Sequence, residues 1–402
     1  MRFVFHSGTK ITTKDCSEKG LPKFANQMSG LYIHIPFCSQ ACHYCDFHFS
    51  TDNRNRTELI KALCKELDLQ ADYLNNKVLE TVYFGGGTPS ILSPEEFLLI
   101  QEHIHKNFSI REKAEITLEA NPEDLSIQKL QFFAAQGINR LSVGIQSLDD
   151  ETLKHLNRVH QSHEALAAIS NARNTGFRNI SVDLIFGIPG RTADVLEKDI
   201  LKILELKPEH ISVYGLTIEP KTVFGVQHKR GKFLPVSDDQ QADEFEMISN
   251  QLEQCGYRQY EVSNFSIPGF ESIHNSNYWK QKHYLGIGPG AHSFNGHSRQ
   301  FNISNNPLYE KSISENKIPF EREVLTPSNR INEYIMTSLR TAEGCNLEVL
   351  LNTMNYDLLK VHQEYADMLI STEKAVIEGH YLRLTKRGRL IADKISGDFF
   401  TE

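Results

Sequence analysis

The hydrophobic residues in the first half of the chain fall into short runs separated by longer amphipathic stretches. Six runs rich in β-branched and aromatic residues predict buried strands, at residues 31–35, 80–84, 115–119, 140–144, 180–186 and 210–216. Between and after them apolar residues recur at helical spacing, which predicts helices at 55–75, 94–107, 125–136, 150–157, 163–175 and 193–206. This alternation predicts βα units whose parallel strands are joined by right-handed crossovers.

Repeated βα units of this kind are typical of a complete or partial barrel, whose active site lies at the carboxyl ends of the strands. The second predicted strand runs into the glycine-rich segment 85–90, the third ends at Glu119 and the fourth ends at Gln146. Glycines allow a ligand to approach the backbone, and the absence of a following lysine excludes a Walker phosphate loop. The pattern therefore predicts a small-molecule site at this rim.

Beyond residue 220 the alternation stops. A polar connector is predicted first, then a helix and a strand-like segment, at residues 221–240, 240–254 and 257–265. The glycine-rich stretch 284–293 follows no clear strand, and we expect its backbone to close over the site. Residues 325–400 alternate predicted helices, at 331–341, 346–352 and 356–371, with a hairpin and a last helix, a layout typical of a winged helix. The expected domains are 28–220, 221–324 and 325–402.

Composition excludes several classes of protein. The 402 residues include 43 Lys and Arg against 51 Asp and Glu, a net charge of −8 that argues against a nucleic-acid-binding face. No run reaches the roughly 18 apolar residues of a membrane span, so we do not expect an integral membrane protein. Seven cysteines, three of them clustered, do not form the framework of a secreted disulfide-rich protein. We therefore expect a cytoplasmic protein.

Residues 1–27 are polar and lack the apolar centre of a signal peptide. A mitochondrial presequence is disfavoured because Asp15 and Glu18 interrupt the basic residues. Met28 stands just before the first predicted strand. We therefore expect either that translation begins at Met28 or that residues 1–27 form a disordered extension.

A cluster of cysteines directly follows the first predicted strand, at Cys38, Cys42 and Cys45. Their spacing indicates a metal centre and leaves two alternatives. Zinc needs a fourth ligand, for which the candidates are His43, Asp46 and His48. A cubane iron–sulfur cluster takes one thiolate per iron, so three cysteines leave one iron open to another ligand. The spacing favours the cluster and keeps zinc as the alternative.

CxxxCxxC after a strand, with Tyr44 before the last cysteine, resembles the radical S-adenosylmethionine (SAM) superfamily. The flanks LYIHIPFC and CDF are similar to its HemN/HemW branch, which contains an oxygen-independent coproporphyrinogen oxidase and a heme chaperone. The resemblance implies an α/β fold with a (β/α)6 partial TIM barrel, a HemN-like α+β region and a winged-helix-like end. It also implies a [4Fe–4S] cluster on the three cysteines, with SAM bound to the open iron. The oxidase carries a further cysteine where this chain has Phe47.

The resemblance also supplies expected binding residues for SAM. They are Tyr32, Gly86, Gly87, Thr88, Glu119, Gln146, Arg158 and Asp183. Carboxylates suit the ribose hydroxyls and the amino group of SAM, and an arginine suits its carboxylate. No catalytic residue is assigned.

A second motif, HNxxYW at residues 274–279, resembles the heme-associated motif of HemW proteins and contains the chain's one tryptophan. It implies heme contacts by His274, Asn275, Tyr278 and Trp279. A histidine can ligate heme iron and aromatic rings can cover a porphyrin face, but the ligating residue is left open. His and Tyr four residues apart share one helical face.

The motifs together imply a heme chaperone that passes heme to acceptor proteins, which we expect to be respiratory and membrane-associated. Whether the protein is an enzyme stays open, and coproporphyrinogen oxidase activity is not expected. That oxidase is the alternative function, and a structural zinc protein is the third reading.

Overall fold

The computed structural model describes residues 29–402. The expectations for residues 1–27 and for Met28 lie outside the described residues. No helix within 29–402 is long and apolar enough to cross a membrane.

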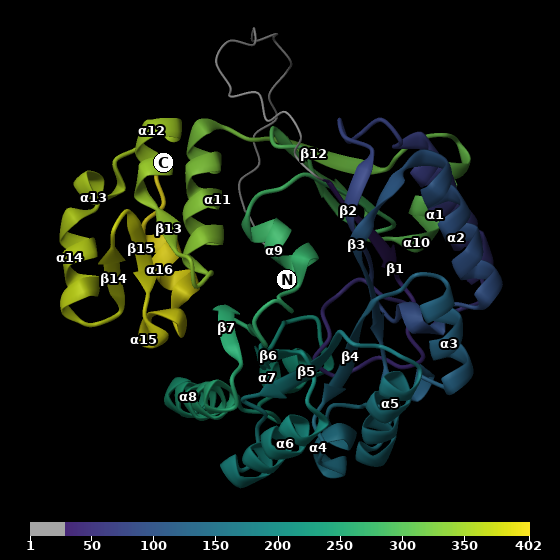
Figure 1. Cartoon of the computed structure of the whole chain (residues 1–402), viewed down its shortest axis with the longest axis horizontal. Helices are drawn as coiled ribbons and strands as arrows, with labels where there is room; N and C mark the ends of the chain where they lie inside the picture. Colours follow the sequence, from purple (N-terminus) through teal and green to yellow (C-terminus); the bar gives the residue numbers. More distant parts are fainter. Residues whose placement is uncertain (1–28) are drawn as a thin grey trace, which may run out of the picture.

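The first half of the described chain forms six βα units, as the sequence predicts (Figure 1). The parallel strands are β1 (Ser29–Ile35), β2 (Val78–Gly86), β3 (Ser109–Ala120), β4 (Arg140–Gln146), β5 (Ile180–Phe186) and β6 (His210–Gly215). The main helices between and after them are α1 (Arg56–Leu69), α2 (Pro94–Asn107), α3 (Ile127–Ala135), α4 (Asp150–His155), α5 (Ser162–Asn174) and α6 (Ala193–Leu206). Single 3-10 turns, η1 (Pro89–Ile91) and η2 (Pro122–Asp124), follow β2 and β3.

The strands of residues 221–324 extend both edges of this sheet. The full order is β12-β11-β10-β9-β1-β2-β3-β4-β5-β6-β8-β7. The added strands are β7 (Arg258–Glu261), β8 (Asn264–Ser266), β9 (Tyr284–Ile287), β10 (His292–Phe294), β11 (Ser298–Asn302) and β12 (Phe320–Val324). Strand β9 runs parallel to β1, whereas the other five join through antiparallel pairs.

Three local expectations for this region were wrong. The polar connector contains a helix, α7 (Val223–Lys229), and the predicted strand at 257–265 is the two-stranded hairpin of β7 and β8. The glycine-rich stretch 284–293 begins with a strand, β9. Its four residues pair with β1, and a strand this short is specified by its partner more than by its own sequence. The remaining helices here are α8 (Asp238–Gln254), α9 (Ile273–Trp279) and α10 (Asn306–Ser314).

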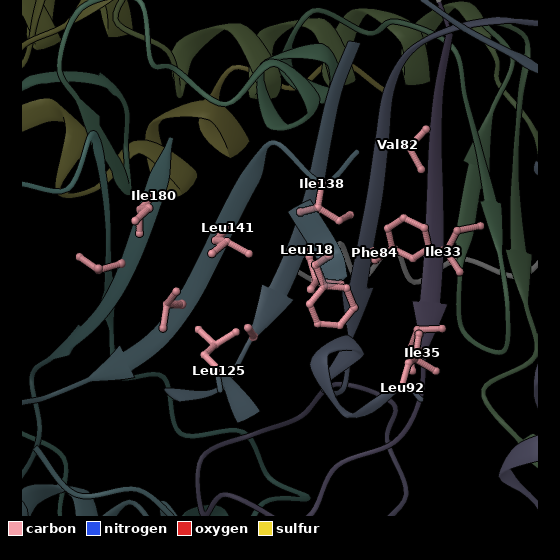
Figure 2. Packing of buried hydrophobic residues seen from close by; sticks show 14 of the residues in the cluster. Ile33, Ile35, Val82, Phe84, Leu92, Leu118, Leu125, Ile138, Leu141 and Ile180 are labelled. Atoms are coloured by element: carbon pink, nitrogen blue, oxygen red, sulfur yellow. The ribbon is translucent and has the colours of Figure 1, made fainter. Parts of the chain in front are cut away.

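Each barrel strand alternates between an apolar outer face and a polar inner face. The outer residues, among them Ile33, Phe84, Leu118 and Leu141, join the helices in one continuous hydrophobic core (Figure 2). The inner positions carry hydrogen-bonding side chains with little solvent exposure. They include Thr81, Tyr83, Glu115, Thr117, Arg140, Ser142, Ser181, His210 and Ser212.

Residues after 325 form a module with a hydrophobic core of its own, on the left of Figure 1. Its helices are α11 (Pro327–Leu339), α12 (Leu347–Met354), α13 (Leu358–Val361), α14 (Gln363–Ser371), α15 (Lys386–Arg389) and α16 (Ala392–Asp398). Its sheet contains β13 (Cys345–Asn346), β14 (Ala375–Glu378) and β15 (Tyr381–Leu384), in the order β13-β15-β14. The hairpin and surrounding helices match the predicted winged-helix layout.

A single buried carboxyl group ties α1 to the added strands. Glu66 is fully buried and accepts hydrogen bonds from Gln70 Nε2 at 2.7 Å, Asn302 Nδ2 at 2.7 Å and the Gly288 amide at 2.8 Å. The Tyr309 hydroxyl on α10 donates a further bond. Burial raises the pKa of Glu66 to about 7, although the four hydrogen bonds act in the opposite direction.

This pKa makes stability depend on pH. Between the unfolded value of 4.5 and about 7, the folded state holds the Glu66 proton more tightly than the unfolded state does. The contribution of Glu66 to the free energy of unfolding is therefore complete below pH 4.5 and is lost as the pH rises through 7. We expect the free energy of unfolding of the wild type to fall over this range by up to about 3 kcal/mol relative to Glu66→Gln. Urea unfolding at several pH values measures the difference.

Glu102→Gln is the matched control, because Glu102 is exposed on the neighbouring helix α2. A wild-type-minus-Glu66→Gln difference that stays constant from pH 5 to pH 8 would contradict the prediction.

Candidate functional site

The predicted metal centre lies in a loop that is closed at its base. Strand β1 ends at Ile35, and the Ser50 amide then donates to the Pro36 carbonyl at 2.8 Å. The Cys38 amide in turn donates to the Ser50 carbonyl at 3.0 Å. These bonds hold the cysteine loop, residues 36–50, at the carboxyl end of β1. Cys38, Cys42 and Cys45 are all free thiols and partly buried.

Neighbouring strands and loops supply hydrogen-bond donors to these sulfur atoms. Thr88 Oγ1 donates to Cys38 Sγ and Arg158 Nη1 donates to Cys42 Sγ, each at 3.4 Å. Burial raises the pKa of Cys38 to about 11 and the pKa of Cys45 to about 12. A bound cation is therefore needed to hold these thiols as thiolates near neutral pH.

The donor set fits an iron–sulfur cluster. Among residues 29–402 no three metal-binding side chains converge closely enough to hold one ion. Thiolates of a cubane each bind a different iron, so the three cysteines need not meet at one point. Sulfur atoms that accept bonds from a hydroxyl and a guanidinium also match the hydrogen bonding that tunes such clusters.

Arg158 joins several predicted SAM residues into one network beside the cysteines. Its Nη2 donates to Asn121 Oδ1 at 2.6 Å and to the Gly144 carbonyl at 2.9 Å. Asn121 Nδ2 then donates to Thr88 Oγ1 at 3.3 Å, and Thr88 reaches Cys38. The predicted residues Thr88 and Arg158 therefore lie together at the cysteine loop.

The glycines after β2 allow a close backbone approach between this strand and β1. Gly86 has a φ of 112°, and a Cβ there would lie 2.6 Å from the His34 ring. A Cβ on Gly87 would lie 2.6 Å from the Phe37 carbonyl oxygen. Only glycine fits both positions, and the Gly86 amide is left to donate to Glu119 Oε2 at 3.0 Å.

Two carboxyl groups face the barrel interior near this network. Glu119 also accepts a bond from the Tyr83 hydroxyl at 2.7 Å, and burial raises its pKa to about 7. Burial likewise raises the pKa of Asp183, which accepts a bond from Ser142 Oγ at 3.4 Å. A polar or cationic ligand group would stabilise the ionised form of either carboxyl group, because a buried carboxylate needs a compensating partner.

The last two predicted SAM residues also lie on the first and fourth strands. The Tyr32 hydroxyl is 3.0 Å from His34 Nδ1, inside the barrel. Gln146 ends β4 with a φ of 65°, a left-handed conformation that turns the backbone at this point. The eight predicted residues thus occupy the inner face and carboxyl ends of β1 to β5 and the loop after α4.

The HNxxYW motif lies elsewhere. It forms α9, whose first turn is held by Glu115 from β3: the Ile273 and His274 amides donate to this carboxylate at 2.9 and 2.8 Å. The His274 ring also lies 3.5 Å from the position of a Cβ on Gly30, at the start of β1. This end of the strands is opposite to the cysteine loop.

Both ring nitrogens of His274 have partners within the protein. Nδ1 is 2.7 Å from Thr81 Oγ1 and Nε2 is 2.8 Å from the Tyr278 hydroxyl. The residue is 2% exposed, and burial lowers its pKa to about 3, so the ring is neutral. It packs against Tyr83 with ring centroids 4.8 Å apart. His274 thus fastens α9 to the barrel.

The motif's tryptophan faces the C-terminal module. The Arg340 guanidinium lies 5.3 Å from the centre of the Trp279 ring, and the Arg340 carbonyl accepts a bond from the Val262 amide. Arg340 Nη1 also pairs with Asp393 on α16. The motif helix therefore contacts both the barrel and the module.

Sequence reasoning missed three residues of this arrangement: His34, Tyr83 and Glu115. All three alternate with apolar residues within their strands, and that alternation is the signal that could have found them. His34 Nε2 is 2.8 Å from the His48 carbonyl and so connects β1 to the end of the cysteine loop. The partners of Glu115 come more than 150 residues later, and no sequence pattern indicates that contact.

Comparisons with known proteins agree with this geometry. Residues 32–203 match the model of the radical SAM superfamily, and residues 325–391 match that of the HemN C-terminal domain. The chain is 35% identical over 384 residues to a Bacillus subtilis protein named heme chaperone HemW, covering 93% of this chain and 100% of that one. It is 33% identical to a Lactococcus lactis protein of the same name, covering 92% and 97%.

A similar solved structure is the Escherichia coli coproporphyrinogen III oxidase HemN, described as a radical SAM enzyme. The TM-score is 0.81, and the match covers 93% of this chain and 90% of HemN at 23% identity. This likeness confirms the predicted fold class. The superfamily match implies a [4Fe–4S] cluster and SAM as cofactors.

The hydrogen bond to Cys38 leads to a test of the cluster site. Thr88→Val keeps the shape of the side chain and removes the donor to Sγ. We expect the cluster's midpoint potential to fall by tens of millivolts, because a bond worth about 1 kcal/mol that favours the reduced, more negative cluster is lost. Redox titration of the reconstituted protein, followed by electron paramagnetic resonance, measures the shift.

Thr88→Ser is the control, because it keeps the hydroxyl group and should retain the wild-type potential. A potential that is equal in Thr88→Val and wild type would show that this bond does not influence the cluster.

The capping of α9 leads to a second test. Glu115→Ala leaves the buried His274 amide and the partly buried Ile273 amide without an acceptor, which we expect to cost about 2–4 kcal/mol. Trp279 lies at the end of this helix and is the chain's one tryptophan, so its fluorescence reports the loss of docking. We expect a red-shifted emission and an earlier urea midpoint.

Glu112→Ala, at an exposed position of the same strand, should change neither property. An unchanged emission maximum in Glu115→Ala would mean that the carboxylate does not hold the helix.

Proposed function

Because this chain belongs to the HemW family of the radical SAM superfamily, we propose that it is a heme chaperone that delivers heme to acceptor proteins. The observation that carries the proposal is the match at 35% identity, over 93% of this chain, to a protein named for this activity. Phe47 supports the proposal, because coproporphyrinogen oxidases of the HemN branch carry a further cysteine at this position. Free thiols at all described cysteines support a reducing compartment, which we propose to be the cytoplasm.

We further propose that Cys38, Cys42 and Cys45 hold the cluster and that its open iron binds SAM. The supporting geometry is the network at the carboxyl ends of the strands, in which Arg158 and Thr88 reach two of the sulfur atoms. When bound, the cluster supplies electron transfer to SAM. The protein's part is to orient SAM. Gly86 and Gly87 allow a close approach of the backbone, and Glu119, Asp183, Tyr32 and Gln146 offer polar groups.

The heme site is proposed at the HNxxYW motif, with His274, Asn275, Tyr278 and Trp279 as the contacting residues. Tyr278 and Trp279 are only partly buried and provide flat apolar area. His274 is buried with both ring nitrogens bonded, so heme contact through it requires α9 to move away from Thr81. Heme held there is released when the helix returns, which suits a carrier.

The alternative function is oxygen-independent coproporphyrinogen III oxidation. The observation that favours it is the shared fold, at a TM-score of 0.81 to HemN. An anaerobic assay that yields decarboxylated porphyrinogen would establish it. Because the fold is common to both functions, this product assay and heme binding together separate them.

The heme-binding proposal is tested by titration of anaerobically reconstituted protein. We expect a heme difference spectrum with a Soret band, and we expect this band to be weaker in His274→Ala than in the wild type. Transfer of heme to an acceptor, followed by separation of the two proteins, then tests delivery.

Ser276→Ala is the control, since it changes the same helix outside the named motif residues. Wild-type protein that binds no heme would refute the chaperone function, and a spectrum unchanged in His274→Ala would remove the motif from the heme site.

A further inference from the structure

The cluster proposed above needs a source of electrons. A cluster that supplies an electron to SAM must first gain one, and it must gain another before each further transfer. A partner that carries electrons therefore has to come close to the cysteine loop. The surface that borders this loop is the place to look for its binding site.

Two helices are bonded directly to the cysteine loop. The Phe224 amide, at the start of α7, donates to the His43 carbonyl at 3.0 Å. The His43 amide donates to the carbonyl of Leu156, just after α4, at 3.1 Å. His43 is the neighbour of Cys42, one of the proposed cluster ligands. A protein that binds over α4 and α7 therefore reaches the residue next to a cluster ligand.

Helix α7 and the residues after it are strongly basic. Residues 221–234 contain no Asp or Glu, although the whole chain has a net charge of −8. The cations of this segment are all exposed, and they are Lys221, Lys229, Arg230 and Lys232. Within residues 29–402 none of the four forms an ion pair, whereas Lys386 of the C-terminal module pairs with Glu253. The segment is thus a local reversal of the overall charge.

A lysine on α4 enlarges this basic surface. Lys154 and Gln227 of α7 line the same hollow beside His43. Lys154 is exposed, and in the described part of the chain it forms no ion pair. Glu151 is the one carboxylate that lines the hollow. We call the surface formed by Lys154 and residues 221–234 the α7 face, and its Lys and Arg residues outnumber this carboxylate.

Exposed apolar side chains lie among these cations. Val223 and Val226 are 41% and 40% exposed, and their spacing places them on one side of α7 together with Arg230. Leu234 is 71% exposed. Apolar side chains within a polar rim are typical of protein interfaces. The small apolar area suits the transient complexes of electron-transfer proteins, which bury less than about 1,200 Å2.

Buried rings hold the basic segment in place. Phe233 stacks on Phe224 with ring centroids 4.5 Å apart, and the two residues are 6% and 1% exposed. The His228 ring nitrogen Nδ1 lies 3.0 Å from the Phe233 carbonyl oxygen. These contacts fold residues 228–233 back onto α7. The cations are therefore positioned before a partner arrives, which lowers the entropic cost of binding.

We propose that the α7 face binds an acidic one-electron carrier protein that reduces the cluster. This inference rests on the proposed cluster site. In the transfer the carrier loses one electron and the cluster gains it, and no bond is formed or broken at the cysteines. Unpaired cations beside the loop attract an acidic carrier and raise its association rate.

An anionic membrane would also be attracted by these cations, but the apolar side chains favour a protein. Helices that lie in a membrane interface insert large side chains such as Trp, Phe and Leu. Helix α7 has only seven residues, and the apolar side chains that it exposes are the two valines.

Reduced flavodoxin, a small acidic flavin protein, is the probe. Anaerobic stopped-flow mixing with reconstituted full-length protein follows the loss of cluster absorbance. We expect Lys229→Glu and Lys154→Glu each to slow this reduction by about 10-fold at low ionic strength, at the lower end of the effects of electrostatic steering. Added salt should make the difference smaller, because it screens exposed charges.

Lys113→Glu is the matched control, because it makes the same change of charge at an exposed position on β3. We expect it to keep the wild-type rate. Reduced methyl viologen is a second donor that is too small to need a docking surface, and it should reduce all four proteins equally fast. Calorimetric titration with oxidised flavodoxin measures binding without electron transfer, and we expect about 10-fold weaker binding in Lys229→Glu and Lys154→Glu.

Several results would overturn the α7 face without touching the cluster site. They are wild-type rates and affinities in both variants, an equal slowing with methyl viologen, and an equal slowing in Lys113→Glu. Loss of binding to phosphatidylglycerol vesicles, with unchanged flavodoxin binding, would assign the face to a membrane instead. Wild-type protein that assembles no cluster would refute the proposed cluster site, and this inference with it.

Discussion

Polar side chains on the inner face of the barrel need hydrogen-bond partners, because an unpaired polar group away from water costs about 1–3 kcal/mol. Several inner side chains meet this constraint by pairing with one another, as Tyr83 does with Glu119 and Ser181 does with His210. Thr117 Oγ1 and the Nε and Nη1 atoms of Arg140 are exceptions, because they have no hydrogen-bond partner within residues 29–402. At the amino ends of the strands the partners come from α9, which supplies two amides to Glu115. The position of the motif helix therefore follows from the polar interior.

The same constraint has a different solution at the carboxyl ends. There the sulfur atoms of the cysteine loop accept bonds from Thr88 and Arg158, and Asn121 connects these two residues. The partners are attached to the ends of β2 and β3 and to the loop after α4, so several strands hold one loop. A loop held in this way can present thiolates at fixed positions without being part of the sheet.

Much of the barrel could be predicted from the sequence, because its signals are local. Helix α2 begins with a capping box in which Ser93 and Glu96 bond each other's backbone, and its bounds match the predicted 94–107. Strand β5 is apolar apart from its inner residues Ser181 and Asp183, and such apolar-rich runs are typical of parallel strands. Strands β9 to β12 are short and lack this pattern, and their place beside β1 is fixed by distant partners such as Glu66. The cysteine loop could also be predicted, because its three cysteines lie close together in the sequence. The contact of Glu115 with α9 could not, because the two lie more than 150 residues apart.

The two ends of the barrel differ in how their chain segments are held. The motif helix has only seven residues and is held by Glu115, Thr81 and the stacking of His274 on Tyr83. Its tryptophan packs under Arg340, so the helix also contacts the C-terminal module. The cysteine loop is held differently, because Ser50 closes it with backbone hydrogen bonds to Pro36 and Cys38. The motif helix thus depends on side chains of β2 and β3 and on the C-terminal module, whereas the cysteine loop is closed by its own backbone.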